Sequence, residues 1–487
     1  MNIIPKIRLF NPMRLFLFLL FTICLAVNDV APQVAETGRQ PNIIHILAGD
    51  VGYDDMGCYG STTILTPNLD RLAAEGVRLT GFYSPHGSGT ASRAAILTGR
   101  YAPRMNKGKG IPALTPESEN GLDPSAEVTI AALLKSKGYT TGIIGSWQLG
   151  HLAKYLPANQ GFEYFMGIPY AKDLGPEQPG GTGLNDYPPI PLIRDTLILK
   201  YCSNPDLAEL PALFRQEACR FIRDAAGKGK PFYLLFAPVE TQVPWFIPQG
   251  FDADGPAGNF GDAVSFMDLS TGAILKTLKE IGIEQNTLIV FSSDNGPQIN
   301  RDKELETCYG KYARTDTSRV HLLRGGKDQS RYEGGVRVPC ILRWPGVIPG
   351  KTTSDMIAAG FDLFATFAAA AGTPLPSGVI IDGKSLLPAL TGQQTEPVHL
   401  LFFGFEPDGM LMSVRYKNWK LAVPSIQTGG APELGDYELY QLEKDPGERF
   451  NVAPRFPEIV DQLRQFGEKA KAALRDNGKM PQKNFIE

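Results

Sequence analysis

The sequence predicts an α/β fold, in which helices flank a mostly parallel central sheet and a smaller C-terminal α+β subdomain follows. Short apolar runs alternate with amphipathic segments along most of the chain, which is typical of parallel strands joined by helices. The runs are apolar throughout, as in strands that are covered on both faces. Beyond about residue 395, closely spaced strands and one last helix indicate an antiparallel sheet instead.

In the larger part, we expect strands at residues 42–48, 140–144, 231–236, 286–292 and 336–343. Helices are expected at residues 66–75, 92–97, 129–137 and 260–281. The first helix opens on Thr66 and Pro67, a capping residue and a residue that the first turn tolerates. The last one repeats apolar residues on one face at helical spacing. Residues 175–191 are rich in glycine and proline and are expected to form a loop.

The C-terminal part is expected to contain strands at residues 400–405, 410–416 and 420–423 and a helix at residues 458–474. We therefore expect two domains, a large α/β domain at residues 40–395 and the C-terminal subdomain at residues 396–487. Apolar residues make up 43% and charged residues 20% of the chain, which excludes a disordered chain or a coiled coil. The formal net charge of −3 argues against a nucleic-acid partner.

The N-terminus has the pattern of a signal peptide, which we place at residues 1–30. Lys6, Arg8 and Arg14 precede the apolar run at residues 15–27, which is shorter than the ~20 residues of a spanning helix. An uncleaved anchor is the alternative. Either way, the folded part is expected outside the cytosol, secreted or periplasmic, with no membrane contact beyond this segment.

The cysteines do not form a convincing disulfide framework, because five of the six would remain after cleavage. Cys202 and Cys219 are the most plausible bridge, and buried free thiols are the alternative. No cysteine pair has the spacing of metal ligands.

Polar side chains follow two of the expected strands. Asp50 comes after the first strand, and Asp294 and Asn295 come after the strand at residues 286–292. Ligands collect at the carboxyl ends of strands in α/β sheets, and carboxylate and amide oxygens suit Ca²⁺ or Mg²⁺. The loop at residues 87–91 precedes a helix whose free N–H groups would attract an anion. A simple turn is the alternative for Asp294 and Asn295.

Several motifs together resemble the formylglycine-dependent sulfatase family, which is arylsulfatase-like and has an alkaline-phosphatase-like fold. They are GYDDMGCYG (52–60), TPNLDRLAAEG (66–76), SRAAILTGRY (92–101), NTLIVFSSDNG (286–296), LRGGK (323–327) and YEGGVRVP (332–339), with VRYKNWKL (414–421) and ELYQLEKDPGERFN (438–451) further on. The resemblance implies that a Cys or Ser in the pattern C/S-x-P/A-x-R is oxidised to formylglycine. The hydrated formylglycine attacks sulfur, assisted by a divalent cation, usually Ca²⁺, and by two lysines and two histidines.

The resemblance places the family's nucleophile and metal ligands on specific positions of this chain. Arg93 matches the motif arginine, so the nucleophile position is Gly89, and a glycine cannot become formylglycine. The first metal-binding pair, usually two aspartates, is Gly49 and Asp50. The second metal-binding pair is retained as Asp294 and Asn295. We therefore expect no formylglycine and a weakened Ca²⁺ site.

The family's charged and proton-transferring groups are also changed. Ser146 stands where a lysine is usual, and Gln148 and Gln242 stand where histidines are usual, whereas Lys327 is retained. A glutamine keeps hydrogen bonding but cannot exchange a proton near neutral pH. Losing one general acid or base typically costs ~10²–10⁴-fold in rate. We interpret the chain as an exported family member that has lost catalysis and binds either a sulfated small molecule or glycan, or a partner.

Two other functions stay open. Ser88, Thr90 or Ser92 could replace the nucleophile of an active sulfatase or phosphoesterase, with His86 as the base. The alternative is that these hydroxyls cap the helix or line the loop and that His86 is an exposed loop histidine. A purely structural or regulatory role, for example pairing with an active sulfatase, is the third possibility.

Overall fold

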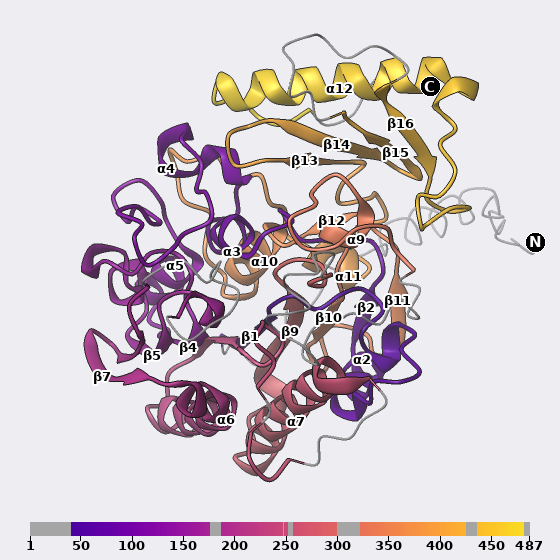
Figure 1. Cartoon of the computed structure of the whole chain (residues 1–487). Coiled ribbons are helices and arrows are strands. Elements are labelled where there is room, and N and C mark those ends of the chain that lie inside the picture. Colours follow the sequence, from indigo (N-terminus) through magenta and orange to yellow (C-terminus); the bar gives the residue numbers. More distant parts are fainter. Residues whose placement is uncertain are drawn as a thin grey trace, which may run out of the picture. The chain divides into compact units, whose positions relative to one another are not determined.

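The computed structural model describes residues 40–175, 187–246, 248–251, 257–299, 322–424 and 436–481. The chain divides into two units, Met1–Gly38 and Arg39–Glu487. The signal peptide expected at residues 1–30 lies outside the described residues. The larger unit contains a ten-stranded sheet and a four-stranded sheet (Figure 1).

The centre of the ten-stranded sheet is parallel. Its five middle strands, in spatial order, are β9 (Thr287–Ser293), β1 (Asn42–Ala48), β8 (Phe232–Ala237), β4 (Thr140–Ser146) and β5 (Tyr164–Ile168). The outer strands are β10 (Cys340–Arg343), β2 (Val77–Leu79) and β11 (Thr352–Ser354) beside β9, and β6 (Ile190–Arg194) and β7 (Leu197–Cys202) beside β5. Since β6, β7 and β10 pair antiparallel, the predicted mostly parallel sheet is confirmed with antiparallel flanks.

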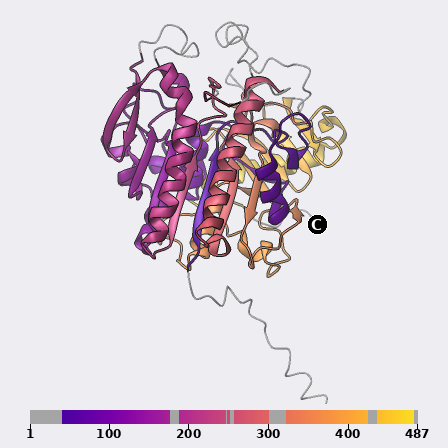
Figure 2. The ribbon, with the colours of Figure 1, turned by 90° about the horizontal axis from the view of Figure 1, so that it is seen from below.

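Helices cover both faces of this sheet. The long helices α6 (Asn204–Gly227) and α7 (Gly258–Glu280) lie side by side on one face, and α2 (Pro67–Glu75) packs against α7 (Figure 2). On the other face, α10 (Asp362–Ala370) packs against α3 (Gly89–Thr98) and α5 (Ile130–Ser136). The described chain also has short helices, α4 (Met105–Gly108), α9 (Glu333–Val336) and α11 (Leu387–Leu390).

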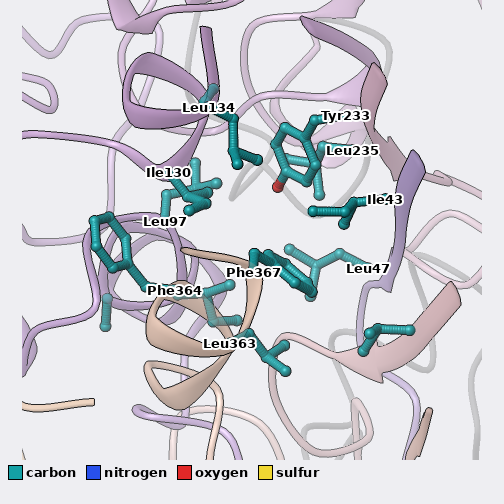
Figure 3. Packing of buried hydrophobic residues seen from close by; sticks show 14 of the residues in the cluster. Ile43, Leu47, Leu97, Ile130, Leu134, Tyr233, Leu235, Leu363, Phe364 and Phe367 are labelled. Atoms are coloured by element: carbon teal, nitrogen blue, oxygen red, sulfur yellow. The ribbon is translucent and has the colours of Figure 1, made fainter. Parts of the chain in front are cut away.

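The side chains of β1 alternate between two hydrophobic cores, one on each face. Ile43 and Leu47 belong to the core that α3, α5 and α10 complete, which Figure 3 shows with Leu97 and Phe367. Ile44 and Ile46 belong to the core under α6 and α7. Strand side chains point to opposite faces in turn, so a strand between two helical layers is apolar at every position.

The C-terminal sheet is antiparallel, with the order β13 (Leu401–Phe405), β14 (Leu411–Tyr416), β15 (Trp419–Ala422) and β16 (Glu438–Gln441). Helix α12 (Pro457–Arg475) packs along it (Figure 1). A buried ion pair joins this sheet to α9, because Lys420 Nζ in β15 lies 2.9 Å from Glu333 Oε1. This architecture confirms the predicted α/β fold with a smaller C-terminal part.

Of the segment 175–191, expected to be a loop or excursion, residues 176–186 lie outside the described residues, and β6 begins at Ile190. The single strand expected at 336–343 is wrong, because this segment is the end of α9 followed by β10. The helix α6 was not predicted, because a proline inside a segment argues against a helix and Pro211 lies inside this one. Cys202 and Cys219 are free thiols. Within the described ranges, every helix is too short or too polar to cross a bilayer.

Candidate functional site

The carboxyl ends of the five parallel strands gather the residues that the sequence singled out. Gly49 and Asp50 follow β1, Asp294 and Asn295 follow β9, Ser146 ends β4 with Gln148 just beyond it, and Gln242 lies in the segment after β8. Because these strands are neighbours in one sheet, residues up to about 245 positions apart meet at a single edge. The residues that the sequence singled out therefore lie together at this edge, as predicted.

Asp50, Asp294 and Asn295 form a buried acidic cluster. Asn295 Nδ2 donates to Asp50 Oδ1 at 2.8 Å, and the Asp50 backbone N–H donates to Asp294 Oδ1 at 3.2 Å. Asp50 has a φ of 59°, a left-handed conformation that turns the chain sharply after β1. Burial raises the pKa of Asp294, and the nearby Asp50 carboxylate raises it further, although Arg93 opposes both effects.

Two cations neutralise this cluster from within the chain. Lys327 Nζ lies 3.0 Å from Asp50 Oδ2, and Arg93 Nε lies 2.8 Å from Asp294 Oδ2. Burial alone would lower the pKa of Lys327, but the carboxylates of Asp50, Asp173 and Asp328 together raise it. Lys327 and Arg93 are therefore already paired with Asp50 and Asp294.

Gly89 is the first residue of α3 and faces the acidic cluster. A Cβ atom at this position would lie 3.1 Å from Asp294 Oδ2, 3.1 Å from Gln148 Oε1 and 3.5 Å from Asn295 Oδ1. A side chain here would thus project directly at the retained aspartate and asparagine. Because Gly89 has no side chain, it places no oxygen ligand and no nucleophile beside Asp294 and Asn295.

Gln242 occupies the space beside Gly49. A Cβ atom at Gly49 would lie only 2.7 Å from Gln242 Nε2 and 2.8 Å from Gln242 Cγ. Thr241 Oγ1 donates to the Gly49 carbonyl at 2.5 Å, which fixes the backbone of one segment against the other. Two of the changed positions are therefore packed against each other, and an aspartate at 49 cannot coexist with this glutamine conformation.

Ser146 and Gln148 also contact each other. Gln148 Nε2 donates to Ser146 Oγ at 3.1 Å, and Arg93 Nη1 donates to the Ser146 carbonyl at 2.7 Å. Gln148 has a φ of 62°, so the turn after β4 is strained for a residue other than glycine. Both side chains are buried and neutral, so neither supplies a charge or a mobile proton to this edge of the sheet.

Sequence reasoning missed a second buried polar group, Lys172, Asp173 and Glu240, in the segments after β5 and β8. Lys172 is fully buried, and within the described chain its Nζ, Asp173 Oδ1 and Glu240 Oε2 have no hydrogen-bond partner. Burial lowers the pKa of Lys172 to about 7, although the carboxylates of Glu240, Asp173 and Asp50 oppose this shift. The signal that could have revealed it is a Lys-Asp pair directly after a buried strand.

The hydroxyls that flank Gly89 have different surroundings. Ser88 Oγ lies 3.0 Å from His86 Nδ1, and His86 Nε2 lies 3.1 Å from Glu406 Oε2. Ser92 is buried and its Oγ lies 2.9 Å from Ser84 Oγ, while Thr90 is nearly buried. Of the two alternatives, capping the helix or lining the loop, Ser88 follows the second, since its side chain makes no capping hydrogen bond and contacts His86 in the loop. His86 is not an exposed loop residue, since it is 4% exposed.

The acidic cluster fits a divalent cation only in part. Asn295 Oδ1 is buried without a hydrogen-bond partner among the described residues, and is the atom most available to a cation. Both carboxylates accept hydrogen bonds from the chain itself, and Gly49 and Gly89 add no side-chain oxygen. Ca²⁺ takes 6–8 oxygen ligands. No cluster of three or more His, Cys, Asp or Glu side chains that could hold a metal occurs in the part of the chain that the structure describes.

Comparisons with known proteins find relatives over most of this chain. A family model described as "Sulfatase" matches residues 41–373, and a second, "N-sulphoglucosamine sulphohydrolase, C-terminal", matches residues 328–472. Arylsulfatase A of Homo sapiens is 38% identical over 468 residues, covering 88% of this chain and 87% of that protein. The N-acetylgalactosamine-6-sulfatase of Canis lupus familiaris is 32% identical, covering 91% and 87%. The solved structure of the PsFucS1 sulfatase from Pseudoalteromonas sp. is 27% identical, with a TM-score of 0.76 and 92% of each chain covered.

Proposed function

Because this chain belongs to the sulfatase family, we propose that it is an exported family member that binds a sulfated small molecule or glycan and no longer hydrolyses sulfate esters through formylglycine. One observation carries the proposal. The Cβ position of residue 89 points at Asp294, Gln148 and Asn295, and a glycine leaves that position without an attacking oxygen.

The surrounding groups support the loss of turnover. Gln148 and Gln242 have replaced proton-transferring residues, and Ser146 brings no charge to the end of β4. Removing one such group costs ~10²–10⁴-fold, and the losses act on the same reaction. A divalent cation held by Asp50, Asp294 and Asn295 would bind sulfate oxygens, but it must compete with Lys327 and Arg93 for the carboxylates.

Ligand binding is supported by buried donors at this edge. Arg93 Nη2 and Lys172 Nζ are buried and have no hydrogen-bond partner among the described residues. Leaving such groups unpaired is costly unless a ligand or water satisfies them. The family relative named for N-acetylgalactosamine-6-sulfate suggests the first saccharide to try.

The test has two parts, both on the purified mature chain. Calorimetric titration should detect binding of N-acetylgalactosamine 6-sulfate and none of N-acetylgalactosamine. Lys172→Met should weaken that binding at least tenfold, whereas Lys135→Met, which changes an exposed lysine, should not. Equal affinity for the neutral sugar would contradict the proposal.

The second part is an assay of turnover with Ca²⁺ and a chromogenic aryl sulfate or aryl phosphate. We expect no turnover, and peptide mass spectrometry should find neither an aldehyde nor its hydrate on residues 86–93. Brisk turnover would favour the alternative, an active sulfatase or phosphoesterase with a substitute hydroxyl. Absence of both binding and turnover would favour a structural or regulatory role.

A further inference from the structure

A serine and a histidine in the loop before α3 form one hydrogen-bonded chain with a carboxylate of the C-terminal sheet, and the proposed function does not use this chain. His86 is the middle member, 3.0 Å from Ser88 Oγ through Nδ1 and 3.1 Å from Glu406 Oε2 through Nε2. His86 is 4% exposed, and Glu406 follows β13 in the C-terminal sheet. Ser88, His86 and Glu406, from two distant parts of the sequence, are therefore linked in that order by hydrogen bonds.

The backbone fixes the protonation pattern of this chain. The Ser88 N–H donates to His86 Nδ1 at 2.9 Å, so Nδ1 is an acceptor and the ring proton lies on Nε2, facing Glu406. Burial would raise the pKa of Glu406, but the hydrogen bond from His86 lowers it, which keeps the carboxylate charged. Nδ1 has one lone pair, which the N–H and the hydroxyl of Ser88 share, so the hydrogen bond from the N–H must break when Nδ1 takes the hydroxyl proton.

Ser88 is also placed where a nucleophile can work. It is the residue before the ten-residue helix α3, and its side chain points to His86 instead of capping the helix. Ser88 is half-buried, whereas residues 82–87 and 89–98 are buried. The first N–H groups of a helix have no acceptor within it, so the N–H groups of Gly89 and Thr90 can stabilise a negative oxygen.

We propose that Ser88 is the nucleophile of a carboxylic-ester hydrolase, with His86 as its general base and Glu406 as a positioning residue. Ser88 Oγ bonds to the ester carbonyl carbon while its proton moves to His86 Nδ1. The carbon–oxygen bond to the alcohol breaks, and the alcohol leaves with that proton. Water then attacks the acyl-serine, giving its proton through His86 to Ser88 Oγ, and the free acid is released.

The surroundings favour a carboxylic ester over a sulfate ester as the substrate of Ser88. Transfer of a charged sulfuryl group needs proton-transferring acids beside it, and positions 146, 148 and 242 hold none. The cations that remain at this edge, Lys327 and Arg93, are paired with Asp50 and Asp294. A neutral carbonyl develops a single negative charge, which two N–H donors can stabilise. This activity goes beyond the proposed function and does not depend on it.

The full mature chain, mixed with p-nitrophenyl acetate, tests the inference. We expect a burst of one p-nitrophenolate per chain and one acetyl group on the peptide that carries Ser88. Ser88→Ala should abolish both, and Ser88→Cys, which keeps a nucleophile, should retain the burst. Ser136→Ala, which changes an exposed serine, is the matched control and should behave as the parent protein.

The roles of His86 and Glu406 are tested by measuring the rate constant of acylation in variants of each residue. His86→Gln should slow acylation by ~10²–10⁴-fold. Glu406→Gln should lower the acylation rate constant with KM unchanged, since it acts through the histidine. A merely structural role would instead lower the melting temperature and leave the rate of the folded protein unchanged. Acetyl groups on lysines alone, no burst, or turnover of p-nitrophenyl sulfate or phosphate without acetate would each overturn the inference.

Discussion

The contact between Gly49 and Gln242 predicts that adding a single carbon at residue 49 destabilises the protein. In Gly49→Ala, the new Cβ would lie 2.7, 2.8 and 3.0 Å from Gln242 Nε2, Cγ and Cδ. Carbon atoms in good contact are about 3.5–4.0 Å apart, so the glutamine must move by close to 1 Å. Gln242 is 4% exposed and the backbone of residue 49 is held by Thr241, so there is little room to move.

The magnitude follows from overpacking, which costs about 1–3 kcal/mol for an added methyl group in a filled interior. All three close atoms lie beyond the Cβ of Gln242, so Gln242→Ala removes every one of them. Gln242→Ala alone should cost about 1 kcal/mol in lost packing. The double variant should therefore be more stable than the sum of the two single effects by about 1–2 kcal/mol.

Denaturant unfolding of the four proteins measures this coupling. Gly227→Ala is the matched control, because no atom lies within 4 Å of a Cβ at that helix end, and it should change the free energy of unfolding by less than about 1 kcal/mol. A Gly49→Ala protein as stable as the parent, or strict additivity in the double variant, would refute the reasoning.

Three further predictions concern reactivity and pH. Gly89→Cys, co-produced with a formylglycine-generating enzyme, should still fail to turn over an aryl sulfate, and robust turnover by this single variant would contradict the loss of the helper groups. Binding of a sulfated sugar should weaken as the pH rises through about 7. Lys172 attracts the anion only when it is protonated, and the pKa of Lys172 is lowered to about 7. Equal affinities in titrations at pH 6 and pH 8.5 would contradict this. Burial lowers the pKa of His45 in the folded protein to about 3. As the pH falls, the imidazole is therefore protonated in the unfolded chain before it is protonated in the folded protein. Stability should drop between about pH 6.5 and 3, by about 2 kcal/mol at pH 5, and His45→Gln should flatten that slope in thermal unfolding.

The strands that carry the site could be predicted because a buried parallel strand leaves a plain pattern in the sequence. The predicted strand at 42–48 coincides with β1, and the runs at 140–144 and 286–292 lie within one or two residues of β4 and β9. Once the strands are known, the sheet places Asp50 and Asp294 at the same edge. The resemblance then supplied the positions of Gly89 and Lys327.

Other parts of the site depend on tertiary packing and left little trace in the sequence. His86 reads as an exposed loop histidine until Glu406, 320 residues away, is placed beside it. Lys172 follows β5, a strand that was not predicted. The burial of Lys172 and the lack of a hydrogen-bond partner for its Nζ among the described residues could therefore not be predicted either. The packing of Gln242 against Gly49 depends on distances of tenths of an ångström, which no spacing of residues reveals.

These contacts bear on how catalysis would have been lost. Removing one member of a buried charge pair usually costs 3–5 kcal/mol, because the other charge is left unpaired. Here each retained aspartate keeps a cation, Lys327 for Asp50 and Arg93 for Asp294. The substituted residues fill space for one another, with Gln242 beside Gly49 and Gln148 bonded to Ser146. If catalysis has been lost as proposed, residues 49 and 242 form one compatible pair and residues 146 and 148 another. Restoring the family's residue at one of these positions would then bring its side chain against a neighbour that fits the present residue.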